Sequence, residues 1–154
     1  MATEADVARV TELLGRKPQG EFEVVVRRAN GDPVVVRNSP LLDDGTPMPT
    51  LFWLVGKEEY TVVSRLEAAG GVDQAEAEVD PVDLEAAHAS YARLRSEAMP
   101  SEHTGPAPSA GVAGTRKGVK CLHAHFAWWL AGGNDPVGVW VAQRVDYASE
   151  LRHV

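Results

Sequence analysis

Hydrophobic residues recur at helical spacing in the first part of the chain, between positions 3 and 14. Thr3 stands before this run and Asp6 follows three residues later, which is the spacing of a capping box. Gly15 and Pro18 then interrupt the pattern, as residues that end a helix do. The pattern therefore predicts a first helix from Thr3 to Leu14.

The next segment consists of short β-branched runs separated by turn residues. The runs at 22–28 and 34–37 enclose Asn-Gly-Asp-Pro at 30–33, a sequence typical of a tight turn. A third apolar run, 51–55, follows a loop that contains two prolines. These runs predict three strands, and the uniformly apolar third run indicates a buried one.

Helical spacing returns in the middle of the chain. The segment 57–69 predicts a helix that Gly70 ends. Asp80 and Pro81 have the residue types preferred at the N-cap and at the first helical position, so a further helix is expected over 81–97.

The remaining pattern completes a predicted α+β fold. Residues 67–85 hold seven acidic side chains and no lysine or arginine, which we interpret as a solvated loop and the first turn of a helix. Residues 99–117 are rich in Pro, Gly, Ser and Ala and predict a long flexible loop. Two more helices are expected over 119–131 and 136–151, the second of them capped by Asp135 and Pro136. The prediction is one domain over 1–154, a small antiparallel sheet of about three strands packed with four to five helices.

Charge and composition narrow the classes of function. The chain has 154 residues and a net charge of −7, whereas general binding to nucleic acid or to anionic lipid depends on a basic surface. The N-terminal residues lack the apolar core of a secretory signal, and no run of about 18 apolar residues is present for a membrane span. We therefore expect a cytoplasmic protein without a nucleic-acid or membrane partner. A single cysteine allows no internal disulfide.

The candidate chemistry lies in GVKCLHAHFAWWLAGGNDPVG, from Gly118 to Gly138. If the segment is helical, Cys121 and His125 share one face and could bind a divalent metal such as zinc, while His123 points elsewhere. The same three side chains are candidates for catalysis, because an imidazole activates a neighbouring thiol and exchanges protons near neutral pH. The simplest alternative is an inert, half-buried cysteine on an amphipathic helix.

A basic, glycine-rich segment precedes this helix and suggests an anion site. Arg116, Lys117 and Lys120 stand among glycines in GVAGTRKGVK, where a helix N-terminus would offer N–H groups to an anion. It is not a Walker A loop, because the spacing fails and a cysteine follows Lys120 where Ser or Thr is required. We expect a small anionic ligand, for example a phosphorylated one, with Arg65 and Thr50 adding to the site if their segments converge on it. A solvated basic loop is the alternative.

Three motifs, DGTPMPTLFWL, VSRLEAAGG and the segment from Gly118 to Gly138, resemble the bacterial, mainly actinobacterial family called domain of unknown function 501. The resemblance runs from about Glu23 to Gln143. Outside the third motif, the matching positions are Arg27, Gly31, Pro33, Gly45, Thr46, Pro47, Pro49, Thr50, Trp53, Ser64, Arg65 and Glu67.

The resemblance implies no enzymatic activity and leaves open whether the protein is an enzyme. It does imply a gene context beside a septum formation initiator and an exopolyphosphatase. The alternative to a small-ligand site is therefore a non-enzymatic interaction module with a protein partner in cell division or polyphosphate metabolism.

The chain departs from the family pattern at two positions. Many members carry a cysteine at the position of Arg28, and another, followed by proline, at the positions of Gly56 and Lys57. If those cysteines bind a metal together with Cys121, this protein has lost or weakened the site. If they pair only with each other, the Cys-x-His-x-His segment is independent of them.

Overall fold

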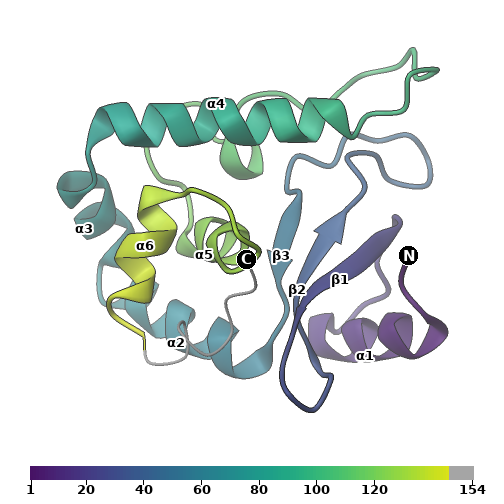
Figure 1. Cartoon of the computed structure of the whole chain (residues 1–154), viewed down its shortest axis with the longest axis horizontal. Helices are drawn as coiled ribbons and strands as arrows, with labels where there is room; N and C mark the ends of the chain where they lie inside the picture. Colours follow the sequence, from purple (N-terminus) through teal and green to yellow (C-terminus); the bar gives the residue numbers. More distant parts are fainter. Residues whose placement is uncertain (146–154) are drawn as a thin grey trace.

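Three strands and six α-helices make up the described part of the chain, residues 1–145 of a computed structural model (Figure 1). Their bounds are α1 Glu4–Leu14, β1 Phe22–Arg27, β2 Pro33–Asn38, β3 Phe52–Leu54, α2 Lys57–Ala68, α3 Gly71–Glu78, α4 Pro81–Glu97, the 3₁₀ helix η1 Val112–Gly114, α5 Leu122–Leu130 and α6 Pro136–Ala142. The predicted α+β class is confirmed. None of the described helices is long and apolar enough to cross a bilayer.

The strands form an antiparallel sheet in the order β1-β2-β3, as the three β-branched and apolar runs predict. A bulge interrupts β1, where Val24 pairs with Val36 and Val26 pairs with Val35. Because a bulge inserts one extra residue, it changes which side chains face each side of the sheet. Val24 thus packs on one side of the sheet and Val26 in the core on the other.

Helices cover both faces of this sheet (Figure 1). On one face α1 packs with a small apolar cluster around Val10, Phe22 and Val36. On the other face α5 lies against β3, and its side chains are mostly buried among those of α2, α3, α4 and α6. Because β2 is central and both of its faces are covered, all its valines are buried.

The predicted helix starts at Thr3 and Asp80 are confirmed. Thr3 Oγ1 accepts a hydrogen bond from the Asp6 N–H at 3.1 Å, and the Asp6 carboxylate accepts the Thr3 N–H at 3.3 Å. Asp80 accepts the N–H groups of Val82 and Asp83 at the start of α4. Each cap satisfies N–H groups that have no partner within the helix.

The expected number of helices, four to five, is too low, because residues 71–78 form α3 instead of a loop. Gly70, at φ 90°, turns the chain between α2 and α3. α3 buries Ala75, and Val79 follows in the same core. Its acidic side chains make the segment resemble a solvated loop, and its apolar face is too short to produce a helical pattern. The helix therefore depends on packing against the rest of the core.

The predicted start of the next helix, at Val119, is wrong by three residues. Gly118 has a left-handed φ of 72°, and α5 begins only at Leu122. The carboxylates of Glu76 and Glu67 accept the N–H groups of Val119 and Leu122, both at 2.7 Å. These side chains hold the backbone extended before the helix starts.

The last helix ends earlier than predicted. α6 finishes at Ala142 and the chain up to Val145 is not helical, while the predicted residues 146–151 lie outside the described part. Its predicted start is confirmed, because Asp135 caps it and Pro136 is its first residue.

Residues 99–117 contain no α-helix or strand, only the short η1. Their C-terminal part is fastened to the proline-rich loop before β3. The guanidinium of Arg95, which is 2% exposed, donates to the carbonyls of Pro49, Gly111 and Ala110 at 2.8, 3.0 and 2.5 Å. The loop before β3, which holds Thr50, and the loop before α5 are therefore joined through α4.

Candidate functional site

A polar stripe on α2 faces the start of α5. Tyr60, Ser64 and Glu67 lie at i, i+4 and i+7 of this helix, so they share one face. Each of the three contacts the ring of His123, which belongs to the first turn of α5. The stripe therefore brings three polar side chains to one imidazole.

Both nitrogens of the His123 ring have partners. Nδ1 lies 3.1 Å from Glu67 Oε2, and Nε2 lies 3.0 Å from Ser64 Oγ. The Tyr60 ring lies over the imidazole at 4.4 Å between centroids and 33° between planes. These contacts fix the orientation of the ring. The side chain is still 17% exposed, so part of it remains accessible to solvent.

Cys121 stands at the N-cap of α5 with extended backbone angles of φ −150° and ψ 150°. The thiol is free and half-buried. Burial raises the pKa of this thiol, and the charge of Glu67 raises it further, while the N–H groups of Ala124 and His123 act in the opposite direction. A high pKa disfavours a free thiolate, so Cys121 by itself is a weak nucleophile.

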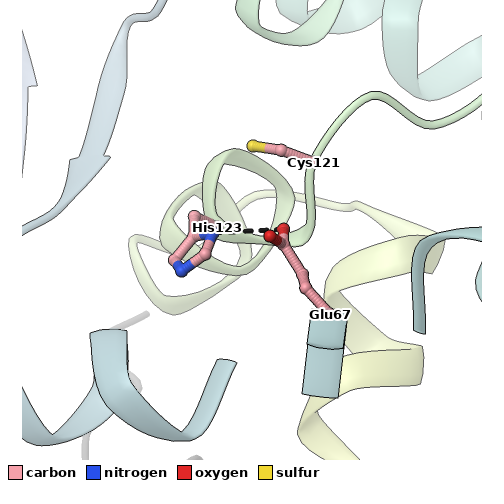
Figure 2. Close-up of side chains that lie close together, drawn as sticks. All are labelled: Glu67, Cys121 and His123. Carbon is pink, nitrogen blue, oxygen red and sulfur yellow. Dashed lines mark hydrogen bonds and ion pairs between the residues drawn. The ribbon is translucent and has the colours of Figure 1, made fainter. Parts of the chain in front are cut away.

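One oxygen of Glu67, the sulfur of Cys121 and one nitrogen of His123 all lie within 4.8 Å of one another. Figure 2 shows the Glu67 carboxylate reaching from the end of α2 to His123, with Cys121 at the beginning of α5. Zinc binds sulfur, nitrogen and oxygen ligands at about 2.0–2.3 Å, which places the ligand atoms roughly 3–4 Å apart. The residues present fit such an ion with small movements of their side chains.

His125 lies in a different environment from this group. It is 1% exposed, and its Nδ1 is 2.6 Å from Oδ2 of the equally buried Asp135. Its Nε2 has no hydrogen-bond partner among the described residues. Because Cys121 precedes the helix, the helical spacing that pairs it with His125 does not apply. That pairing stays a prediction, and the geometry groups Cys121 with His123 and Glu67.

The sequence predicts five ligand-binding residues: Arg116, Lys117, Lys120, Arg65 and Thr50. Arg116 and Lys117 line one cavity of about 710 Å³, whose walls include none of the other three. Lys120 and Arg65 are exposed, and Arg65 lies on α2. Thr50 is half-buried, and its carbonyl accepts a hydrogen bond from Asn38 at 3.0 Å.

Sequence reasoning missed Ser64, Glu67 and Tyr60 as partners of His123. A signal was present, because the three fall at i, i+4 and i+7 of a predicted helix. Glu67, however, also begins a long acidic run, which suggests a solvated surface. Its hydrogen bond to His123 joins residues 56 positions apart, and no local pattern reports such a contact.

The fold and the site define a small α+β protein with a candidate three-ligand metal centre between two helices. A family model described as "Protein of unknown function (DUF501)" matches residues 24–143, and the chain belongs to this family. The resemblance carried by the three sequence motifs is thereby confirmed. No curated protein and no solved structure matches the chain.

Proposed function

We propose that the protein binds a transition-metal ion, with zinc as the best fit, through Glu67, Cys121 and His123. The observation that carries this proposal is the grouping of their three ligand atoms within 4.8 Å. A thiolate and an imidazole favour zinc over magnesium or calcium, which prefer oxygen ligands. Three protein ligands leave a fourth tetrahedral position for water or a substrate, as in catalytic rather than structural zinc sites.

The surroundings of His123 support this proposal. A histidine that binds a metal through one nitrogen usually donates the other N–H to a neighbouring acceptor, which fixes the orientation of the ring. With Nδ1 directed at Glu67 and the proposed ion, Nε2–H donates to Ser64 Oγ at 3.0 Å. Ser64 is then a positioning residue rather than a ligand.

A second candidate function uses the same side chains without a metal, as a proton relay. Here Nδ1–H of His123 donates to Glu67, and Nε2 accepts the hydroxyl proton of Ser64. The distances of 3.1 and 3.0 Å follow the hydrogen-bond order of a Ser-His-acid triad. The two candidates require opposite tautomers of His123, which nitrogen NMR of the labelled ring distinguishes.

Metal content of the purified, untagged protein tests the proposal. Elemental mass spectrometry before and after reconstitution with zinc is expected to find close to one ion per chain. The Cys121→Ser, His123→Ala and Glu67→Gln variants are expected to lose most of it. His103→Ala is the matched control, because His103 lies in the loop after α4, its ring is hydrogen-bonded to the Pro106 carbonyl, and it is not one of the proposed ligands.

His125→Ala separates the two ligand sets that involve Cys121. If Glu67 and His123 complete the site, folded His125→Ala protein keeps its metal. If Cys121 pairs with His125, that variant loses it. Wild-type protein that holds no metal after reconstitution contradicts the proposal and leaves the proton relay and the protein-interaction module as the remaining candidates.

A further inference from the structure

A cavity of about 710 Å³ lies apart from the proposed metal centre, between the N-terminal half of α4 and the segment that precedes α5. Its walls include Glu76, Leu84, Glu85, His88, Arg116 and Lys117. This volume is within the range of small-molecule sites. The wall offers an apolar surface on α4 and two adjacent cations on the opposite segment.

The segment that carries the two cations is held at both ends by one buried histidine. Nδ1 of His88 accepts the Val112 N–H at 3.0 Å, so its proton is on Nε2, which lies 2.9 Å from the Gly118 carbonyl. Gly111 packs directly against this ring, where even a Cβ would collide with it. Both ring nitrogens of His88 are thus hydrogen-bonded. His88 therefore positions the segment and has no free nitrogen for a ligand.

Three further hydrogen bonds hold the same segment in place. Within it, the Gly111 N–H donates to the Thr115 carbonyl at 2.8 Å and the Thr115 N–H to the Val112 carbonyl at 2.9 Å. Just beyond it, Glu76 accepts the Val119 N–H. A binding group on a fixed segment loses little conformational freedom when a ligand arrives, which favours affinity.

Arg116 and Lys117 are available to a ligand. Both are exposed, and neither forms an ion pair with a described residue. Of the two carboxylates in the wall, Glu76 is held by the Val119 N–H through one oxygen, whereas the Glu85 side chain forms no hydrogen bond or ion pair with a described residue and can turn to a ligand. Adjacent arginine and lysine side chains suit a phosphate dianion, because charge-assisted hydrogen bonds to phosphate are strong and arginine can make two at once.

We propose that this cavity binds a small phosphorylated organic molecule. Its phosphate contacts Arg116 and Lys117, its carbon skeleton lies against Leu84, and a hydroxyl or amine donor faces Glu85. An inorganic phosphate would occupy only a small part of a cavity of about 710 Å³, which is why an organic body is expected. The site is independent of the proposed metal centre.

Calorimetric titration tests the proposal with inorganic phosphate, phenyl phosphate and phosphoethanolamine as probes. The Cys121→Ser background removes the proposed metal centre from the experiment. Phenyl phosphate is expected to bind more tightly than inorganic phosphate. Arg116→Gln and Lys117→Gln are each expected to weaken it about tenfold, since each removes a charge-assisted contact. Lys120→Gln is the matched control, because Lys120 is exposed close by but does not line the cavity.

Glu85→Gln gives a second test, in which the affinities of two probes are expected to change in opposite directions. Removing this carboxylate is expected to tighten phenyl phosphate, which has only an anionic group, and to weaken phosphoethanolamine, whose ammonium faces it. A phosphate probe that Arg116→Gln, Lys117→Gln and Lys120→Gln affect equally would lie elsewhere on the surface and would overturn the proposal. So would the absence of binding by all three probes at millimolar concentration.

Discussion

His123 and His125 are two residues apart in the sequence but lie in opposite environments. Side chains two positions apart on a helix point to different sides. The side chain of His123 thus meets Ser64 and Glu67 near the surface, while His125 faces inward to Asp135. Of the two histidines, only His123 is exposed enough to bind a ligand that exchanges with solvent. His125 instead connects α5 to the N-cap of α6.

The buried side chain of His88 makes the stability of the folded protein depend on pH. Burial lowers its pKa below the ordinary 6.5. The Gly118 carbonyl and the charge of Asp135 act in the opposite direction, the charge of His125 lowers the pKa further, and the net shift is downward. The unfolded chain therefore binds a proton at a pH where the folded protein does not. The contribution of His88 to the free energy of unfolding is fully present above pH 6.5. It is lost as the pH falls from 6.5 through the folded-state pKa of His88.

Urea unfolding between about pH 7.5 and about pH 5 measures this dependence. The wild type is expected to lose stability toward the acid end of that range. His88→Gln is expected to be less stable at neutral pH and to show a shallower loss. His103→Gln, in the exposed loop, is expected to keep the wild-type slope. An unchanged slope in His88→Gln would show that other groups carry the dependence.

Among the secondary-structure elements, α4 connects segments that are distant in sequence, because its side chains form hydrogen bonds to their backbones. Tyr91 and Arg95 lie one turn apart on it, and Tyr91 Oη accepts the N–H groups of Leu51 and Phe52 at 2.5 and 3.3 Å. Burial raises the pKa of Tyr91 to about 12, so the hydroxyl stays protonated at neutral pH. α4 thereby sets the position of β3 as well as that of the loops before β3 and α5.

Tyr91→Phe removes the hydroxyl and keeps the ring that packs against Trp128 and Phe52. It leaves two buried N–H groups without this acceptor, so the free energy of unfolding is expected to fall by about 1–3 kcal/mol. Urea denaturation measures the loss. Tyr60→Phe is the control, since Tyr60 is 51% exposed and its stability should hardly change. Equal stability of Tyr91→Phe and the wild type would contradict this role.

Arg95→Met tests the connection between the two loops. It leaves the carbonyls of Pro49, Ala110 and Gly111 without their shared donor, and a loss of roughly 2–4 kcal/mol is expected. Arg95→Lys is expected to lose less, because an ammonium can still reach some of the three. Thermal unfolding of both variants measures the difference, and equal losses would show that packing, rather than the guanidinium, matters here.

Over the whole molecule, the two proposed sites lie on one continuous stretch of chain. Arg116 and Lys117 precede the bound N–H of Val119, and Cys121 and His123 follow it. The carboxylates of α2 and α3 hold this stretch through two backbone N–H groups. The larger core therefore supports both sites, whereas the small core under α1 contributes no side chain to either.

The structure also places positions 28 and 56, where the family resemblance implies a cysteine in many members. Arg28 forms an ion pair with the buried Glu59, and a Cβ at Gly56 would collide with that same carboxylate. The Arg28 guanidinium and the Gly56 backbone thus both lie next to the Glu59 carboxylate. Both alternatives for those cysteines stay predictions, and the group of Glu67, Cys121 and His123 includes neither position.

Features that depend on local interactions could be predicted from the amino-acid sequence. Capping residues marked the starts of α1, α4 and α6, and β-branched runs marked three strands, because caps, turns and side-chain periodicity act over a few residues. The sequence also pointed to the segment with Cys121 and His123. Tertiary structure alone decided that α3 is a helix, that α5 starts at Leu122, and that Glu67 joins Cys121 and His123. Those outcomes depend on packing between segments tens of residues apart, and no local pattern encodes which of them meet.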